Sequence, residues 1–138
     1  MTKKEALQIL AILKAAYPSS YNGMTKEEAT GTVAIWAMQF DDVPVDIVLM
    51  AIHKLIATNK FPPSISEVKS KIGSLHWEAY EMLNSVSYRG FLPEEARMQY
   101  QRIYDATKDF KIAKIAEPPL HKMMVGADGQ PLRIGAGE

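Results

Sequence analysis

The chain has 138 residues, of which 47% are apolar and 23% charged, and its 16 Lys+Arg against 16 Asp+Glu give a formal net charge of +0. A domain of this length buries roughly two-thirds of its unfolded surface and needs no disulfide or metal to fold. The charge balance removes the bulk electrostatic case for nucleic acid or an anionic membrane as the main partner. The chain has no cysteine, which excludes disulfide scaffolds, thiolate metal sites and cysteine nucleophiles.

The amino-terminal segment does not resemble a signal peptide. Its apolar stretch is interrupted by Gln8 and Lys14, and no cleavage pattern follows. No window approaches the length of a membrane span, so we expect a soluble, intracellular protein.

Helix-start signals divide the first half of the chain into short predicted helices. Three pairs have capping-box spacing, in which a hydroxyl residue precedes a glutamate by three positions: Thr2 with Glu5, Thr25 with Glu28, and Ser64 with Glu67. The first helix ends at Tyr17-Pro18, because the residue before a proline avoids the helical region. The second helix carries an apolar stripe at helical spacing, formed by Ala29, Val33, Trp36, Ala37 and Phe40.

Proline and glycine mark the remaining boundaries. Pro44 suits the first turn of a third, mostly apolar helix, and Phe61-Pro62-Pro63 ends it. The helix that begins at Ser64 is predicted to end near Gly73. A fifth helix follows from Leu75 to Val86, and a sixth begins at Pro93 and reaches Thr107; a weak strand candidate covers residues 111–115.

These patterns predict an all-α protein, a small bundle of about five to six short helices with a flexible C-terminal tail. We divide it into an N-terminal bundle (1–72), additional helices (73–116) with a candidate hinge at Gly73-Ser74, and a mobile tail (117–138). The tail holds four of the eight glycines and three of the eight prolines. It cannot bury enough apolar area to offset its ordering entropy.

No catalytic, metal or cofactor site emerges from the residues. His53, His76 and His121 stand far apart, and none has a second histidine three or four positions away, as helical metal sites usually do. The acidic pairs Glu27-Glu28, Asp41-Asp42 and Glu94-Glu95 stand at or just before helix starts, where they offset the macrodipole. Phosphate-binding loops and nucleophile elbows are absent. We therefore expect no enzyme.

A nucleic-acid interpretation is the alternative. Residues 64–72 and 75–83 have helix-turn-helix spacing, but the second of these helices offers Glu78 and Glu81 and no cation before Arg89. Carboxylates there would repel phosphates, so strong direct DNA binding is not expected. The segment 89–114 is more basic and favours at most a weak secondary contact.

The tail carries short apolar clusters that suit a partner's groove. One consists of Leu120, Met123, Met124 and Val125, and a second of Leu132 and Ile134. Methionine side chains adapt well to such grooves, and glycine- and proline-rich segments can order on binding.

Residues 1–72 resemble the replicative helicase loader/inhibitor proteins of phages that infect Gram-positive bacteria. The resemblance rests on the run from Ile9 to Pro18, the Trp36-Ala37 step and the turn-and-cap from Phe61 to Val68. It implies a non-enzymatic adaptor that binds a hexameric DnaB-type helicase, plausibly in its ATP-bound form, inhibits it and helps deliver it to an origin-bound initiator in the bacterial cytoplasm. In that family the N-terminal helices form the folded domain and the flexible C-terminal part engages the helicase.

On this basis the helicase contact is expected from about Tyr100 onward. Its candidate residues are Tyr100, Ile103, Tyr104, Leu120, Met123, Met124 and Val125. The N-terminal bundle is expected to serve as a scaffold and to contact the initiator, through residues that the sequence does not identify. The other hypotheses are a small helix-turn-helix-like DNA-binding regulator and a phage assembly chaperone or structural protein.

Overall fold

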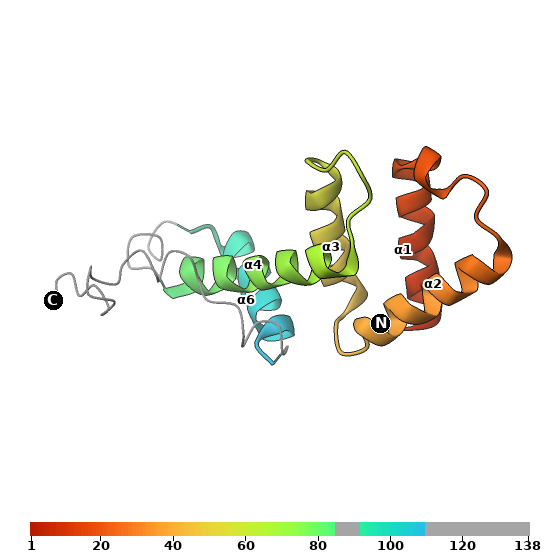
Figure 1. Ribbon diagram of the computed structural model, residues 1–138. Coiled ribbons are helices and arrows are strands. Elements are labelled where there is room, and N and C mark those ends of the chain that lie inside the picture. Colours follow the sequence, from red (N-terminus) through yellow and green to blue (C-terminus); the bar gives the residue numbers. More distant parts are fainter. Residues whose placement is uncertain (85–91, 110–138) are drawn as a thin grey trace, which may run out of the picture. The chain divides into compact units, whose positions relative to one another are not determined.

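A computed structural model describes residues 1–84 and 92–109, which form five α-helices, one 3-10 helix and no strand (Figure 1). The prediction of an all-α protein is confirmed for these residues. Contacts divide the chain into two compact units, Met1–Ile72 (unit 1) and Gly73–Glu138 (unit 2). The strand candidate at 111–115 and the tail from 117 onward lie outside the described residues.

All three predicted capping boxes are present. α1 (Lys3–Ala16) begins after Thr2, and α2 (Lys26–Gln39) after Thr25. In each box the hydroxyl accepts the N–H three residues on, at 3.1 Å, and the glutamate accepts the N–H of the capping residue at 2.8–2.9 Å. Ser64 and Glu67 repeat this geometry at the start of α4 (Ile65–Asn84). Two otherwise unpaired donors are thus satisfied at each helix start.

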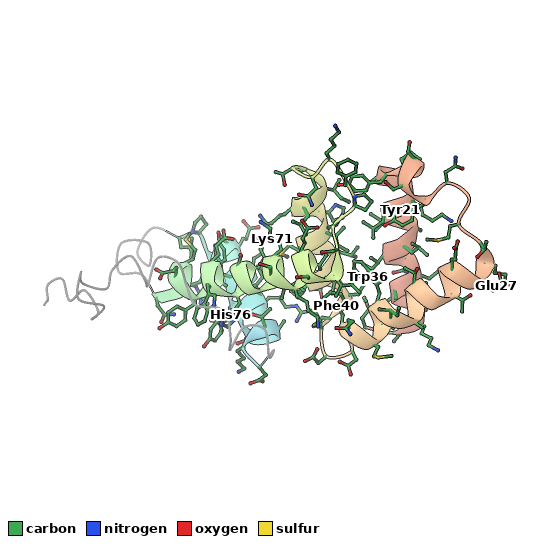
Figure 2. The ribbon with its side chains drawn as sticks, viewed as in Figure 1. Tyr21, Glu27, Trp36, Phe40, Lys71 and His76 are labelled. Atoms are coloured by element: carbon green, nitrogen blue, oxygen red, sulfur yellow. The ribbon has the colours of Figure 1, made fainter. Side chains whose placement is uncertain are left out.

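In unit 1, α1 packs against α2 and against α3 (Val45–Ile56). Trp36 and Phe40 point from α2 into the interior, with ring centroids 5.5 Å apart (Figure 2). The N-terminal ammonium donates to the carbonyls of Phe40 and Val43, both at 3.1 Å, and so holds the start of α1 at the end of α2. The fully buried core of unit 1 includes Ile9, Leu13, Phe40, Ile47, Val48, Ile52, Val68 and Ile72.

α2 departs from the single apolar stripe that its sequence predicts. Ala29 and Val33 are only half-buried, while Ile35 and Met38, outside the stripe, are 51% and 67% exposed. Apolar residues therefore occupy more than one face of this helix. The buried part of the stripe is its C-terminal end, Trp36, Ala37 and Phe40.

The predicted break near Gly73 is wrong, because α4 runs without interruption from Ile65 to Asn84. A glycine inside a helix costs only about 1 kcal/mol relative to alanine, and the buried face continues on both sides of it. That face carries Val68, Ile72, Leu75 and Ala79 at helical spacing. A helix-turn-helix over 64–83 is also excluded, since it requires a turn where α4 is continuous.

Within unit 2, the structure describes the C-terminal half of α4 and α6 (Glu94–Thr107). Pro93 is the N-cap of α6, close to its predicted start. Leu75 and Ala79 of α4 and Ile103 of α6 are buried. They form the apolar part of the described core of this unit.

Candidate functional site

Two buried polar side chains among the described residues of unit 2 are hydrogen-bonded to each other. His76 on α4 is 5% exposed and Thr107 on α6 is 0% exposed. His76 Nδ1 lies 2.8 Å from Thr107 Oγ1, across 31 positions of sequence (Figure 2 shows His76). A polar pair of this kind satisfies groups that would be costly to bury alone.

The hydroxyl of Thr107 fixes the direction of this bond. Oγ1 donates its one proton to the Ile103 carbonyl at 2.7 Å, so it accepts from His76, and we infer that Nδ1 carries the ring proton. Burial lowers the pKa of His76 below its usual 6.5. Burial thus favours the neutral form of His76, which donates to Thr107.

Aromatic rings surround this pair. The His76 ring stacks on Tyr104 with centroids 5.2 Å apart and an interplanar angle of 20°. Trp77 meets His76 edge-on at 4.6 Å, and Tyr80 lies 6.2 Å from Tyr104. Offset and edge-on pairs of this sort are stabilising beyond their buried area. They join α4 to α6.

A pocket of about 400 Å³ opens between the end of α4 and the start of α6. Its described lining consists of Tyr80, Met82, Leu83, Asn84, Leu92, Arg97, Gln101 and Tyr104. Arg97 pairs with Glu94, and Asn84 donates to the Tyr80 carbonyl at 2.8 Å. The described lining thus combines apolar, amide, phenol and guanidinium groups.

The predicted helicase-contact residues divide into three groups. Tyr104 lines the pocket, and Tyr100 is half-buried, where burial and the Glu78 carboxylate raise its pKa. Ile103 is only 7% exposed and belongs to the core. The third group, Leu120, Met123, Met124 and Val125, lies outside the described residues.

The acidic residues and histidines that the sequence analysis considered do not form a site in the described residues. Glu28 caps α2 and Glu94 pairs with Arg97, while His53 is exposed on α3 and His121 lies outside the described residues. Over 1–84 and 92–109, no group of three His, Asp or Glu side chains could hold a metal ion. None of the helices in this part of the chain is both long and apolar enough to span a membrane.

Sequence reasoning missed the His76–Thr107 pair and the pocket. One signal was present: His76 follows Ile72 by four positions and precedes Ala79 by three, so it lies on the buried face of α4. Thr107 occupies the same face of α6 as Ile103, four positions earlier. That the two meet depends on the packing of α4 against α6, which no local pattern encodes.

Comparison with protein families gives one match. The family model for the N-terminal domain of the phage helicase loader/inhibitor proteins matches residues 1–69. No curated protein and no solved structure matches the chain. The matched part covers α1, α2 and α3, the loop after α3 and the start of α4. Because this match extends across half of the chain, the chain belongs to the phage helicase loader/inhibitor family.

Proposed function

We propose that this protein binds a hexameric DnaB-type replicative helicase, inhibits it and helps load it at an initiator-bound origin in the cytoplasm of the bacterial host. The observation that carries the proposal is the family match over residues 1–69. The family is one of adaptors that are generally non-catalytic and that interact with a replicative helicase. Inhibition requires that the adaptor bind more tightly to a helicase state that cannot translocate.

The helicase contact is proposed for α6 and the segment that follows it. Three features of α6 support a binding role: the pocket beside Tyr104, the half-buried Tyr100, and Met98, which is 60% exposed. Ile103 contributes by holding α6 against α4, since it is buried. Leu120, Met123, Met124 and Val125 supply the adaptable apolar side chains.

The test is size-exclusion chromatography with light scattering on mixtures with the helicase, with and without an ATP analogue. The full chain is compared with a truncation after Ala116. A complex that is lost on truncation supports a contact in the tail, whereas a complex that survives moves the contact into the helices. If no complex forms under any nucleotide condition, the loader proposal is wrong.

A matched pair of variants separates the two apolar clusters of the tail. The first variant changes Leu120, Met123, Met124 and Val125 to serine. The control variant changes Leu132 and Ile134 to serine. We expect loss of the complex and of inhibition of ATP-dependent unwinding in the first variant only. Equal loss in both would show that general tail hydrophobicity, not this cluster, is responsible.

A further inference from the structure

One end of unit 1 combines exposed cations with an exposed aromatic ring. Tyr17, directly after α1, donates its hydroxyl to the Asn59 carbonyl at 3.0 Å, which places the end of α1 beside the loop after α3. The C-terminal ends of α1 and α3 therefore lie at the same end of unit 1 (Figure 1). We call the surface formed there by Lys14, Tyr17, Lys54, Lys60 and Phe61 the basic end.

The cations of the basic end are all exposed. Lys14 and Lys54 stand in the last turns of α1 and α3, and Lys60 lies in the loop after α3, with His53 also exposed beside Lys54. No aspartate or glutamate occurs in residues 12–24 or 47–66. Beyond this range, Glu67 is engaged in the cap of α4, and Glu27 lies well away from Tyr21 (Figure 2). The charged side chains of these two segments are therefore all cationic.

Phe61 is the apolar centre of this surface. Its side chain is 68% exposed, and the next two residues are Pro62 and the buried Pro63, which restrict the backbone that presents it. A large ring held out by a rigid loop loses little conformational entropy on binding. Aromatic residues are enriched at the centres of protein interfaces.

We propose that the basic end binds an acidic segment of a partner protein that packs an apolar side chain against Phe61. Carboxylates would meet the three lysine ammonium groups and the electropositive edge of the ring. The chain's own C-terminal segment does not fit this description, because residues 110–138 contain four Lys or Arg against three Asp or Glu. The occupant is therefore assigned to another protein.

The geometry favours a protein partner over single-stranded nucleic acid. Lys60 Nζ lies over the Phe61 ring, 5.7 Å from its centroid, and so covers a face on which a base would stack. Tyr17 is half-buried and its hydroxyl is already bonded to Asn59. Three lysines without an arginine also provide few phosphate contacts.

The test is a chemical-shift titration of the isotope-labelled full chain with a short peptide in which glutamates flank a central leucine pair. A peptide with glutamine in place of each glutamate and an oligothymidine are titrated in parallel. We expect shifts at Lys14, Tyr17, Lys54, Lys60 and Phe61 with the acidic peptide, and about tenfold weaker binding of the neutral one. Raising the salt from about 50 to about 500 mM should weaken the acidic peptide severalfold.

The chain offers matched controls for both parts of the surface. Phe61→Ala should weaken binding about five- to tenfold, whereas Met38→Ala, at nearly the same exposure on α2, should leave it unchanged. Changing three lysines of the basic end together to glutamine (Lys14, Lys54 and Lys60) should weaken binding about tenfold. The same change at three exposed lysines elsewhere in unit 1 (Lys3, Lys4 and Lys26) should leave binding unchanged.

Four results would overturn the proposal. The first is the absence of shifts at the basic end with the acidic peptide. The second is that a basic-end variant and its matched control weaken peptide binding equally. Tighter binding of the oligothymidine at the same residues would assign the surface to nucleic acid. Shifts at these residues that appear on concentrating the protein alone would assign it to a second copy of the chain. None of these outcomes depends on whether a helicase complex forms.

Discussion

Replacing Thr107 by valine should lower the free energy of unfolding of unit 2 by about 2 kcal/mol. Valine has nearly the same shape, so the packing is preserved while the hydroxyl is lost. The His76 Nδ1–H, in a side chain 5% exposed, is then left without the acceptor that lies 2.8 Å away. A buried donor without a partner costs about 1–3 kcal/mol. The Ile103 carbonyl also loses the hydroxyl's bond at 2.7 Å.

Tryptophan fluorescence can report this loss for unit 2 alone. The chain has two tryptophans, Trp36 in unit 1 and Trp77 in unit 2, and the Trp77 ring lies 4.6 Å from His76. In a Trp36→Phe background, urea unfolding followed by Trp77 emission gives the stability of the part that holds the hydrogen bond. The two units need not unfold together, so a signal averaged over both would not measure a single transition.

Two further variants isolate the hydrogen bond from the packing. Thr107→Ser keeps the hydroxyl and removes one methyl group, for which we expect a loss of about 1 kcal/mol. In a His76→Phe background the buried donor is absent, so Thr107→Val should become nearly neutral, with a coupling of about 1–2 kcal/mol. If Thr107→Val costs the same in both backgrounds, the bond does not stabilise the fold and the reasoning is wrong.

Three other perturbations follow from the described residues. Burial lowers the pKa of His76, so the unfolded chain binds the proton more readily than the folded chain. The free energy of unfolding of unit 2 should therefore fall as the pH drops below about 6.5. The variant His76→Gln should reduce this pH dependence in urea titrations between about pH 7.5 and 5.5. Gly31→Ala in α2 should raise the free energy of unfolding by about 0.5–1 kcal/mol, because the added methyl meets no atom within 4 Å; an unchanged or lower urea midpoint would contradict this. Phe40→Ala should lower the free energy of unfolding of unit 1 by about 3–5 kcal/mol, since the ring is 1% exposed. The control Met38→Ala should change it by less than about 0.5 kcal/mol. Similar losses for the two variants, measured by Trp36 fluorescence during unfolding, would disprove the core assignment.

The features that the sequence predicts correctly are those determined by neighbours along the chain. A capping box involves residues three positions apart, and Thr2, Thr25 and Ser64 all form theirs. Proline acts equally locally: α1 ends before Pro18, and α6 begins directly after Pro93. These steric and hydrogen-bonding rules operate whatever the tertiary structure.

The errors arise where tertiary packing outweighs a local preference. Gly73 alone weakens a helix, but the buried face that runs from Ile72 to Leu75 keeps α4 continuous. Distance along the chain explains the other omissions. His76 and Thr107 are 31 positions apart, and the Tyr17–Asn59 hydrogen bond, which places the end of α1 beside the loop after α3, spans 42 positions. Such pairings depend on how helices pack, which single-sequence periodicity does not contain.

The family match and the division of the fold fall almost at the same place. The match ends at residue 69 and unit 1 ends at Ile72, although α4 continues to Asn84 and so supplies residues to both units. The matched range thus lies within unit 1. The His76–Thr107 pair, the pocket and α6 all lie beyond the match. The two proposed contacts are therefore on separate units, and each can be abolished by variants that leave the residues of the other unchanged.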